Sequence, residues 1–408
     1  MLIRLAFRNL FRNSRRTLMS LMMIAGGFAS VVVFQGFAAA ILEDIRWGAV
    51  NSQFGHIQIA SQKLWDPGSD DVFRDRQLER PEELKEKIAA LGDIKSVSAR
   101  QFFYGLASTG EQSVSAQIIG FEPHLETELI SKEMIIEGVP FTPPTKSGQT
   151  IYEAAVGEGL ARLLKAKPGQ TLTIIGQTAD GGINAIDAEI KFLFRTVVQE
   201  IDDTTVYVPL SLSQKVLDSD GAERVVIKLK DHDMVAEVLT KVKAVLPDGT
   251  QARGWRELSR LYNQTERYFE TQNAVVAGII LALILLSITS TVGMSVSERT
   301  GEIGTMRALG DTKPAVLRLF ALEGLLLGGI GGVIGAILGY TISIILTAVK
   351  VPIVLPGATQ PIPVRVTHLP SAYVLAFLLT VFAAFLATMI AARRASQMNI
   401  VDALKKNV

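Results

Sequence analysis

The sequence contains no cysteine and only 4 histidines among its 408 residues. Without cysteine the chain forms no disulfide, offers no thiolate to zinc and carries no cysteine nucleophile. The histidines never stand at the His-x-x-x-His spacing typical of a zinc site on a helix. They are His56, His124, His232 and His368. We therefore expect no metal site.

Other catalytic signatures are missing as well. The chain has no Gly-x-Ser-x-Gly motif, and its glycine-rich segment 176–182 is not followed by the Gly-Lys-Ser/Thr that a phosphate-binding loop needs. The formal net charge of +1 argues against nucleic acid as a partner, because nucleic-acid-binding domains are usually basic. We therefore expect neither catalytic residues nor a bound cofactor in this chain.

Long apolar runs are the clearest feature that is present. Hydrophobic residues make up 48% of the chain and charged residues 20%, a mixture that indicates a membrane protein with a sizeable soluble part. Four runs are long enough to cross a bilayer as helices: 17–42, 274–296, 315–349 and 373–392. A cleaved signal peptide is the competing interpretation of the first run, and its length disfavours it. We predict four spans, the last of them at 370–392.

Residues 43–255 have frequent charges and no run long enough to span a membrane. Both ends of this segment show strand and helix patterns in β-α-β order, which predicts one α+β subdomain formed by 43–124 and 218–255. The predicted strands lie near 55–60, 94–103, 113–121, 224–229 and 250–253, and the helices at 82–91 and 234–246. Residues 125–217 show mainly strand patterns and predict a second, mainly β subdomain.

Residues 256–272 place apolar side chains on one helical face, and we find no helix breaker between them and the second apolar run. We predict that 256–296 form a stalk continuous with the second span. The alternative is a helix that lies flat in the membrane interface. Only a continuous stalk would transmit force rigidly.

The third apolar run carries glycines four residues apart, which form small-residue ridges on a helix. Such ridges let two helices approach closely, either within one chain or between two copies. The predicted packing residues are Gly324, Gly328, Gly332, Gly335 and Gly339. Glu323, beside the first ridge, is either at the membrane interface or buried and paired, and we favour a structural residue near the membrane surface.

Basic residues indicate the topology. Segment 1–16 carries five arginines and no acidic residue, which predicts a basic amphipathic helix at an anionic membrane surface. The segment 297–318 and the tail 393–408 are also basic-rich, whereas 350–369 holds only Lys350 and Arg365. The positive-inside rule then places both termini and the loop between the second and third spans in the cytoplasm. Residues 43–255 and 350–369 are predicted to lie outside.

The cytoplasmic loop 297–310 has the composition of a short helix. Ser297 suits an N-cap and Gly310 the position just past the end, so about three turns fit between them. The charged side chains cannot enter lipid cheaply, so the helix faces water or a partner. An ordinary loop between spans is the alternative. The predicted partner surface comprises Glu298, Arg299, Glu302, Ile303, Met306, Arg307, Leu309 and Gly310.

This loop reads Glu-Arg-x-x-Glu-Ile-Gly-x-x-Arg-Ala-Leu-Gly and precedes a glycine-rich span. It resembles the coupling-helix signature of the FtsX/MacB/LolC–LolE family of ABC-transporter permeases. The tail resembles the family's ending, with Asn399 where a proline often stands. The resemblance covers the whole chain and implies a bacterial inner-membrane protein. It also implies that one subdomain of the extracytoplasmic α+β domain is inserted in the other.

The resemblance implies a mechanotransmission-type permease without a fused ATPase domain. ATP and Mg²⁺ would be bound by a separate cytoplasmic ATPase, present in two copies, and the permease would pair with a second copy or a paralogue. Closure of the ATPase would push on 297–310 and move the outer domain through the stalk. The expected function is to extract or export lipoproteins, lipids or hydrophobic peptides, so that a lipoprotein or another extracytoplasmic protein is a further expected partner.

Two other functions remain open. The same architecture would serve a signalling subunit that regulates an extracytoplasmic cell-wall hydrolase or sensor. A membrane-anchored extracytoplasmic enzyme belongs to a different class, and the lack of catalytic motifs disfavours it.

Overall fold

The computed structural model describes residues 6–8, 10, 12, 14–66, 76–127, 129, 134–143, 150–196, 198–310, 312–353 and 361–396, except for the side chains of 306, 362 and 394–396. The chain divides into two compact units. The helical unit comprises Met1–Glu43, Gln264–Ile353 and Pro363–Val408, and the core unit comprises Asp44–Asn263 and Val354–Ile362.

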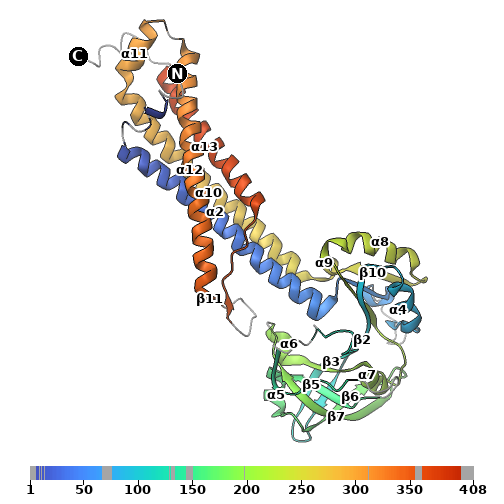
Figure 1. Ribbon diagram of the computed structural model, residues 1–408. Helices are drawn as coiled ribbons and strands as arrows, with labels where there is room; N and C mark the ends of the chain where they lie inside the picture. Colours follow the sequence, from blue (N-terminus) through green and yellow to red (C-terminus); the bar gives the residue numbers. More distant parts are fainter. Residues whose placement is uncertain are drawn as a thin grey trace. The chain divides into compact units, whose positions relative to one another are not determined.

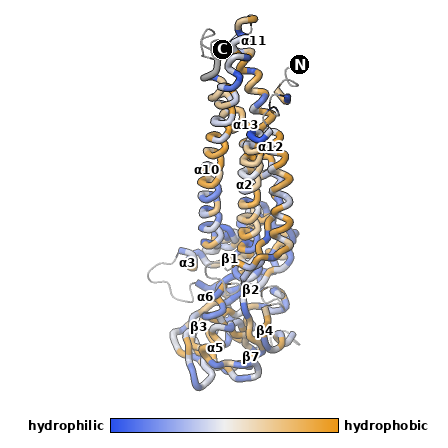
Figure 2. The backbone as a smooth tube through the Cα atoms, turned by 90° about the vertical axis from the view of Figure 1, so that its left-hand side faces the viewer, coloured by the Kyte–Doolittle hydropathy of each residue, from blue (hydrophilic) through white to orange (hydrophobic). Residues whose placement is uncertain are grey.

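Four long helices confirm the predicted spans (Figure 1). They are α2 (Ser14–Gly48), α10 (Arg260–Glu298), α12 (Lys313–Val349) and α13 (Pro370–Ser396). Each is long and apolar enough to cross a membrane. Hydrophobic residues follow most of their length, and the N-terminal part of α10 is more polar (Figure 2). The short helix α11 (Thr300–Ala308) joins α10 to α12, and the short strands β11 (Pro352–Ile353) and β12 (Ile362–Pro363) lie in the predicted loop 350–369.

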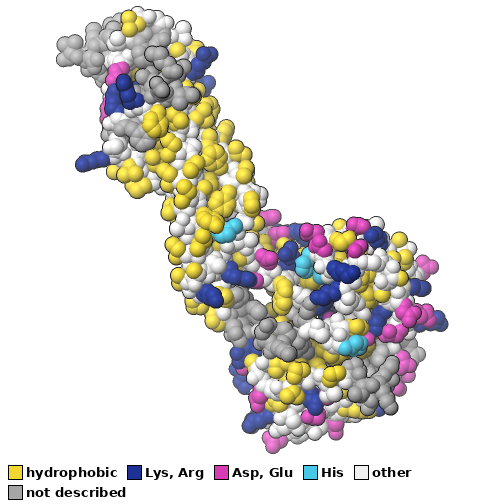
Figure 3. Space-filling model, viewed as in Figure 1, with side chains coloured by type: hydrophobic (Ala, Val, Ile, Leu, Met, Phe, Trp, Pro, Cys, Tyr) yellow, Lys and Arg dark blue, Asp and Glu magenta, His cyan; other side chains and the backbone are white. Residues whose placement is uncertain are grey.

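The outer surface of the helical unit is apolar. On α10 the exposed side chains include Val275, Ile279, Leu283 and Leu286. The face of the long helices seen in Figure 3 is mostly hydrophobic as well. Soluble proteins rarely expose so much contiguous apolar surface, so a lipid bilayer is the medium that fits these helices.

The glycine ridges of α12 pack within the chain. One ridge faces α13, because a Cβ on Gly324 would lie 2.3 Å from Oγ1 of Thr388. Gly328 and Gly332 continue this ridge. On a neighbouring face, a Cβ on Gly335 would lie 2.6 Å from Cβ of Phe28 in α2, and Gly339 lies beside Ala29. Of the two kinds of packing that the sequence leaves open, these glycines serve packing between helices of one chain.

An antiparallel sheet forms the first half of the core unit, in the order β10-β1-β9-β2. Its strands are β1 (Ile57–Ser61), β2 (Ile94–Ser108), β9 (Arg224–Leu229) and β10 (Thr250–Gly254). Helices α4 (Pro81–Ala89) and α8 (Val235–Val245) cover it and share its apolar core. The two β-α-β passages therefore combine into one α+β layer, as the sequence predicts. The short elements η1 (Ala49–Phe54), α3 (Gln62–Trp65), η4 (His232–Met234) and α9 (Trp255–Leu258) flank it.

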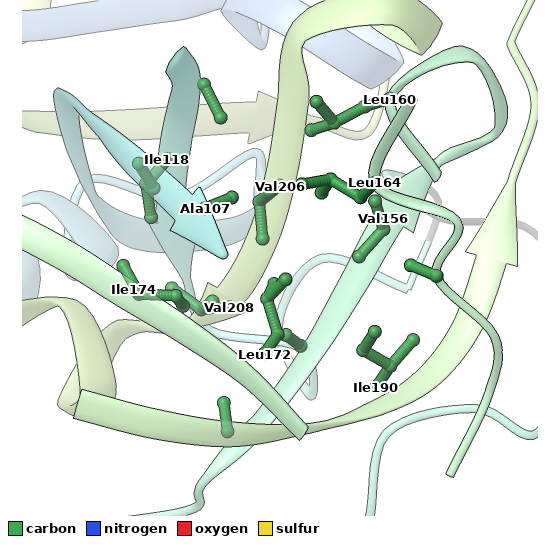
Figure 4. Close-up of a cluster of buried hydrophobic side chains, with 14 of the residues drawn as sticks. Ala107, Ile118, Val156, Leu160, Leu164, Leu172, Ile174, Ile190, Val206 and Val208 are labelled. Atoms are coloured by element: carbon green, nitrogen blue, oxygen red, sulfur yellow. The ribbon is translucent and has the colours of Figure 1, made fainter. Parts of the chain in front are cut away.

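The second half of the core unit is a closed circuit of six strands, paired in the order β2-β3-β8-β5-β7-β6 and back to β2. Besides β2, the circuit contains β3 (Ser113–Phe121), β5 (Glu153–Gly157), β6 (Thr171–Gln177), β7 (Ile183–Phe194) and β8 (Thr205–Pro209). Strand β4 (Ile135–Gly138) lies outside the circuit and pairs with β7. Helices α5 (Glu158–Leu164), α6 (Gln199–Thr204) and α7 (Leu210–Leu217) accompany them. Figure 4 shows part of the apolar interior, to which Ile118, Val156 and Leu172 all contribute side chains.

The boundary between the two halves differs from the predicted one at residue 125. Strand β2 pairs with β9 through Arg100 and with β3 from Gln101 onward. Phe103, Ala107 and Ile118 therefore belong to the second apolar core. The predicted strand 94–103 is too short for the same reason, since β2 is one uninterrupted strand of 15 residues that serves both sheets. The local sequence pattern does not show where β2 changes its pairing partner from β9 to β3.

The predicted stalk has a break at its start. Residues 255–258 form the separate turn α9, and α10 begins at Arg260. Ser259 acts as an N-cap, because its Oγ accepts a hydrogen bond from the Tyr262 N–H at 3.3 Å. From Arg260 to Glu298 the helix is continuous.

Candidate functional site

The candidate site lies around α11, and its start differs from the predicted one. Ser297 is still part of α10, which ends at Glu298, so it is not the N-cap of the short helix. The chain leaves helical geometry at Arg299, with φ −104° and ψ 13°. Thr300 then closes the corner, since its Oγ1 donates to the carbonyl oxygens of Val296 and Ser297. At the other end Gly310 has φ 107°, the left-handed conformation expected of a residue just past a helix.

Arg299 is buried rather than turned toward a partner. Only 9% of it is exposed, and one guanidinium nitrogen donates to Glu323 Oε1 of α12 at 3.1 Å. Its Nε donates to Glu302 Oε2 at 3.2 Å. The predicted role of Arg299 as a surface residue is therefore wrong, and Glu323 is buried and paired rather than near the surface. The physical reason is charge balance, because Glu323, buried within the apolar helix α12, needs a cation within reach.

Two arginines near the N-terminus form ion pairs with the ends of α10 and α11. Arg12 lies 2.7 Å from Glu302, and Arg16 lies 2.7 Å from Glu298. The hydrogen bond from Arg12 holds the pKa of the Glu302 carboxyl below its ordinary value, although partial burial opposes the effect. The sequence suggests only that these arginines meet anionic lipid. The sequence does carry opposite charges in the two segments. However, two residues that are 290 positions apart leave no local pattern that would predict their contact.

The apolar side of α11 divides between the interior and the surface. Ile303 is buried with Val296, Val316 and Phe320, so the prediction that it contacts a partner is wrong. Leu309 is 84% exposed at the opposite end of the helix. Helical periodicity does not reveal which apolar positions meet the chain's own core.

The remaining predicted residues lie at or near the surface. The side chains of Glu298 and Glu302 are 46% and 52% exposed, Arg307 is half-buried, and Gly310 is exposed. The side chain of Met306 lies outside the described residues. Among the described residues of α11 and the turn after it, the exposed ones are Glu302, Thr305, Ala308, Leu309, Gly310, Thr312, Lys313 and Pro314. We call this set the α11 surface.

Several expectations fall partly outside the described residues. Arg4 of the N-terminal segment and residues 397–408 of the tail are among them. In the part of the chain that the structure describes, no three His, Asp or Glu side chains gather as the ligands of a metal ion would.

Two protein families match this sequence in tandem. The MacB-like periplasmic core domain matches residues 17–245, which is more than half of the chain. The FtsX-like permease C-terminal region matches residues 274–400, which include α11 and the last two spans.

Individual relatives agree with these matches. The lipoprotein-releasing system transmembrane protein LolC of Xylella fastidiosa is 26% identical over 239 residues, 56% of this chain and 56% of the relative. The macrolide export ATP-binding/permease protein MacB of Wolinella succinogenes is 25% identical over 386 residues, 86% of this chain and 54% of the relative. The chain thus spans about half the length of these curated relatives.

Among solved structures, the periplasmic region of MacB from Actinobacillus actinomycetemcomitans is 14% identical, covering 54% of this chain and 95% of that one, with a TM-score of 0.37. The argument for the family comes from the two sequence matches and from the four spans with the α+β unit between the first two. The chain belongs to the FtsX/MacB/LolC–LolE family of ABC-transporter permeases and is a multi-pass inner-membrane protein.

Proposed function

We propose that this chain couples ATP hydrolysis in a separate cytoplasmic ATPase, bound in two copies, to movement of its extracytoplasmic core unit. A second permease, either a copy or a paralogue, completes the complex. The observation that carries the proposal is the α11 surface, which is exposed on one side and fixed to the helical unit on the other. The sequence has no Gly-Lys-Ser/Thr phosphate loop, which is why the ATP and Mg²⁺ are assigned to the partner.

The contacts of α11 suit a part that receives a push. The residue before it, Arg299, ties its start to Glu323 of α12, and its middle is held by Ile303 in the apolar core. Glu302 is tied to Arg12 as well. A load applied to the exposed side would therefore displace the attached helices instead of bending a loop, because packed elements move as bodies.

The proposed orientation follows from the basic residues. Lys313 and Arg318 flank α11, and the arginines of the N-terminal segment lie at the same end of the spans through their ion pairs. The positive-inside rule assigns this end to the cytoplasm and the core unit to the outside.

The proposed substrate is a lipoprotein, a lipid or a hydrophobic peptide handled on the outer side of the membrane. Relatives from Xylella fastidiosa and Haemophilus influenzae carry the name lipoprotein-releasing system transmembrane protein. The four apolar runs of the sequence contain one acidic residue, Glu323, and it binds Arg299. A polar substrate path through the spans would need more ionisable groups than that.

The test is co-purification of the tagged chain from its native membrane. We expect an ATPase with a phosphate-binding loop to accompany the unaltered chain. Leu309→Glu should reduce the recovered ATPase about tenfold or more, because it places a charge at an exposed apolar position of the α11 surface.

The matched control is Ile183→Glu in the core unit, where the side chain is 83% exposed and equally apolar. It should leave ATPase recovery unchanged. Recovery of no ATPase with the unaltered chain would refute the proposal and favour an anchored sensor. If the ATPase is recovered but lipoprotein stays in the membrane equally with and without the complex, the signalling function becomes the better account.

A further inference from the structure

The first span enters the core unit through an irregular helix end. After Gly48 the chain continues as the π-helix η1, residues Ala49–Phe54, and Gly55 with φ 67° ends it. Turns of π-helix are rare in proteins, and those that occur are often found at functional sites. The carbonyl oxygens at a helix C-terminus lack helical donors and carry the negative end of the helix dipole. They therefore attract cations or hydrogen-bond donors.

Two buried basic side chains meet these carbonyl oxygens. Arg100 of β2 is 1% exposed and donates to the Gln53 carbonyl oxygen at 2.6 Å. Lys228 of β9 is 3% exposed, and its Nζ lies 3.4 Å from the Asn51 carbonyl oxygen. The two strands are paired neighbours in the first sheet, so the end of the helix is held by two adjacent strands of that sheet.

A single carboxylate balances much of this charge. Glu126 accepts from Arg100 Nε at 2.9 and 3.0 Å and from Ser98 Oγ at 2.7 Å. Burial alone would raise the pKa of Glu126, but the Arg100 guanidinium outweighs it and holds the pKa below its ordinary value. The carboxylate thereby fixes the guanidinium in the orientation that reaches η1.

The other side of η1 is apolar and leads to the second span. Ala49 and Val50 pack with the buried Trp255 of α9, the turn just before α10. The backbone N–H of Trp255 donates to the His56 carbonyl oxygen at the start of β1. The chain entering the core unit and the chain leaving it therefore share one packed cluster.

We propose that Arg100, Lys228 and Glu126 are positioning residues of a joint that fixes the end of the first span to the sheet of the core unit. Their role in coupling rests on the proposed function, because the joint would pass movement of α2 to the core unit. Apolar residues of similar volume often stabilise a fold as well as a buried ion pair does. Hydrogen bonds are directional, so those to the Gln53 and Asn51 carbonyl oxygens also fix the rotation of the helix end about its axis. Apolar contacts do not fix this rotation.

The test measures how firmly η1 is held. The chain lacks cysteine, so Trp47→Cys on α2 and Glu86→Cys on α4 give two unique sites for spin labels, both exposed and both in the core unit. The distance between the labels is measured by pulsed electron resonance on the purified full chain. Arg100→Met with Glu126→Met removes both charges of this ion pair together, so neither member is left buried without the other. We expect the distance distribution to become about twofold wider.

The matched control is Arg195→Met with Glu158→Met, which removes a second Arg–Glu pair of the core unit, between α5 and the residue that follows β7. It should leave the distribution unchanged. If Arg100→Met with Glu126→Met does not fold, Lys228→Met decides in its place, since it keeps the Arg100–Glu126 pair and should also widen the distribution. An unchanged width in the folded variant overturns the proposal. The measurement needs no ATPase, so its outcome is independent of the co-purification test.

Discussion

At the scale of single residues, burial decides what a charged side chain does. Arg299, just before α11, and Glu302, in its first turn, stand three positions apart, yet one is buried and the other half-exposed. Arg299 joins Glu302 to Glu323 of α12. If the buried Glu323 carboxylate loses its cation, it still bears the full free-energy cost of its removal from water. Arg299 therefore holds the corner between α10 and α12 in place.

We expect Arg299→Met to destabilise this corner by about 3 kcal/mol, since the Glu323 carboxylate keeps its burial and loses the guanidinium. The measurement is the temperature at which the detergent-purified chain aggregates, which should fall by several degrees. The double variant Arg299→Met with Glu323→Met should regain most of the loss. A single variant as stable as the unaltered chain would show that the pair does not hold the corner.

At the scale of elements, α12 is a helix with two close-packed faces. Gly324 and Gly328 face α13, while Gly331 and Gly335 face α2. In lipid there is little hydrophobic drive between helices, so association depends on close contact of this kind. The single helix α12 therefore sets the positions of two of its neighbours.

Adjacent glycines of α12 allow a matched test. Gly328→Ala would bring a Cβ to 2.8 Å from Cβ of Ala384 and 3.0 Å from Cα of Val381, and we expect a loss of about 1–3 kcal/mol from overpacking. Gly329→Ala meets nothing within 4 Å and should be neutral or slightly stabilising, because alanine favours a helix more than glycine does. The measurement for both variants is the thermal stability of the purified chain. Equal stabilities would contradict the packing role of the ridge.

At the scale of the whole molecule, two units of different chemistry share two continuous helices. Both α2 and α10 have residues in the helical unit and in the core unit. The helical unit exposes apolar side chains, whereas the core unit encloses its own apolar cores. Coupling between the two sides of the membrane therefore depends on these two helices and on how their ends are held.

The proposed orientation predicts which sites are reachable from outside the cell. Ile183→Cys in the core unit and Leu309→Cys after α11 each introduce a single thiol into a chain without cysteine, at positions 83% and 84% exposed. A membrane-impermeant maleimide should label Ile183→Cys once the outer membrane is permeabilised. Leu309→Cys should react only after the inner membrane is opened. The reverse pattern would invert the proposed topology.

Local patterns predicted most of the elements because hydropathy and turn chemistry act over short distances. The four spans, the β-α-β passages and the short helix before Gly310 all follow from residues close in sequence. Within the candidate site, the exposed positions Glu302 and Leu309 agree with the predicted surface, whereas Ile303 and Arg299 do not. Their burial depends on contacts with Phe320 and Glu323 of α12, which are distant from them in the sequence.

The sequence by itself determined that this chain crosses a membrane four times and carries an α+β unit between the first two spans, since an apolar run or a strand period is a local property. Only the tertiary structure shows which of the charged side chains form pairs. Arg100 meets Gln53 and Glu126, and Arg12 meets Glu302, across long stretches of chain. Such pairings are chosen by the geometry of the fold, because a charge finds its partner in space and not along the sequence.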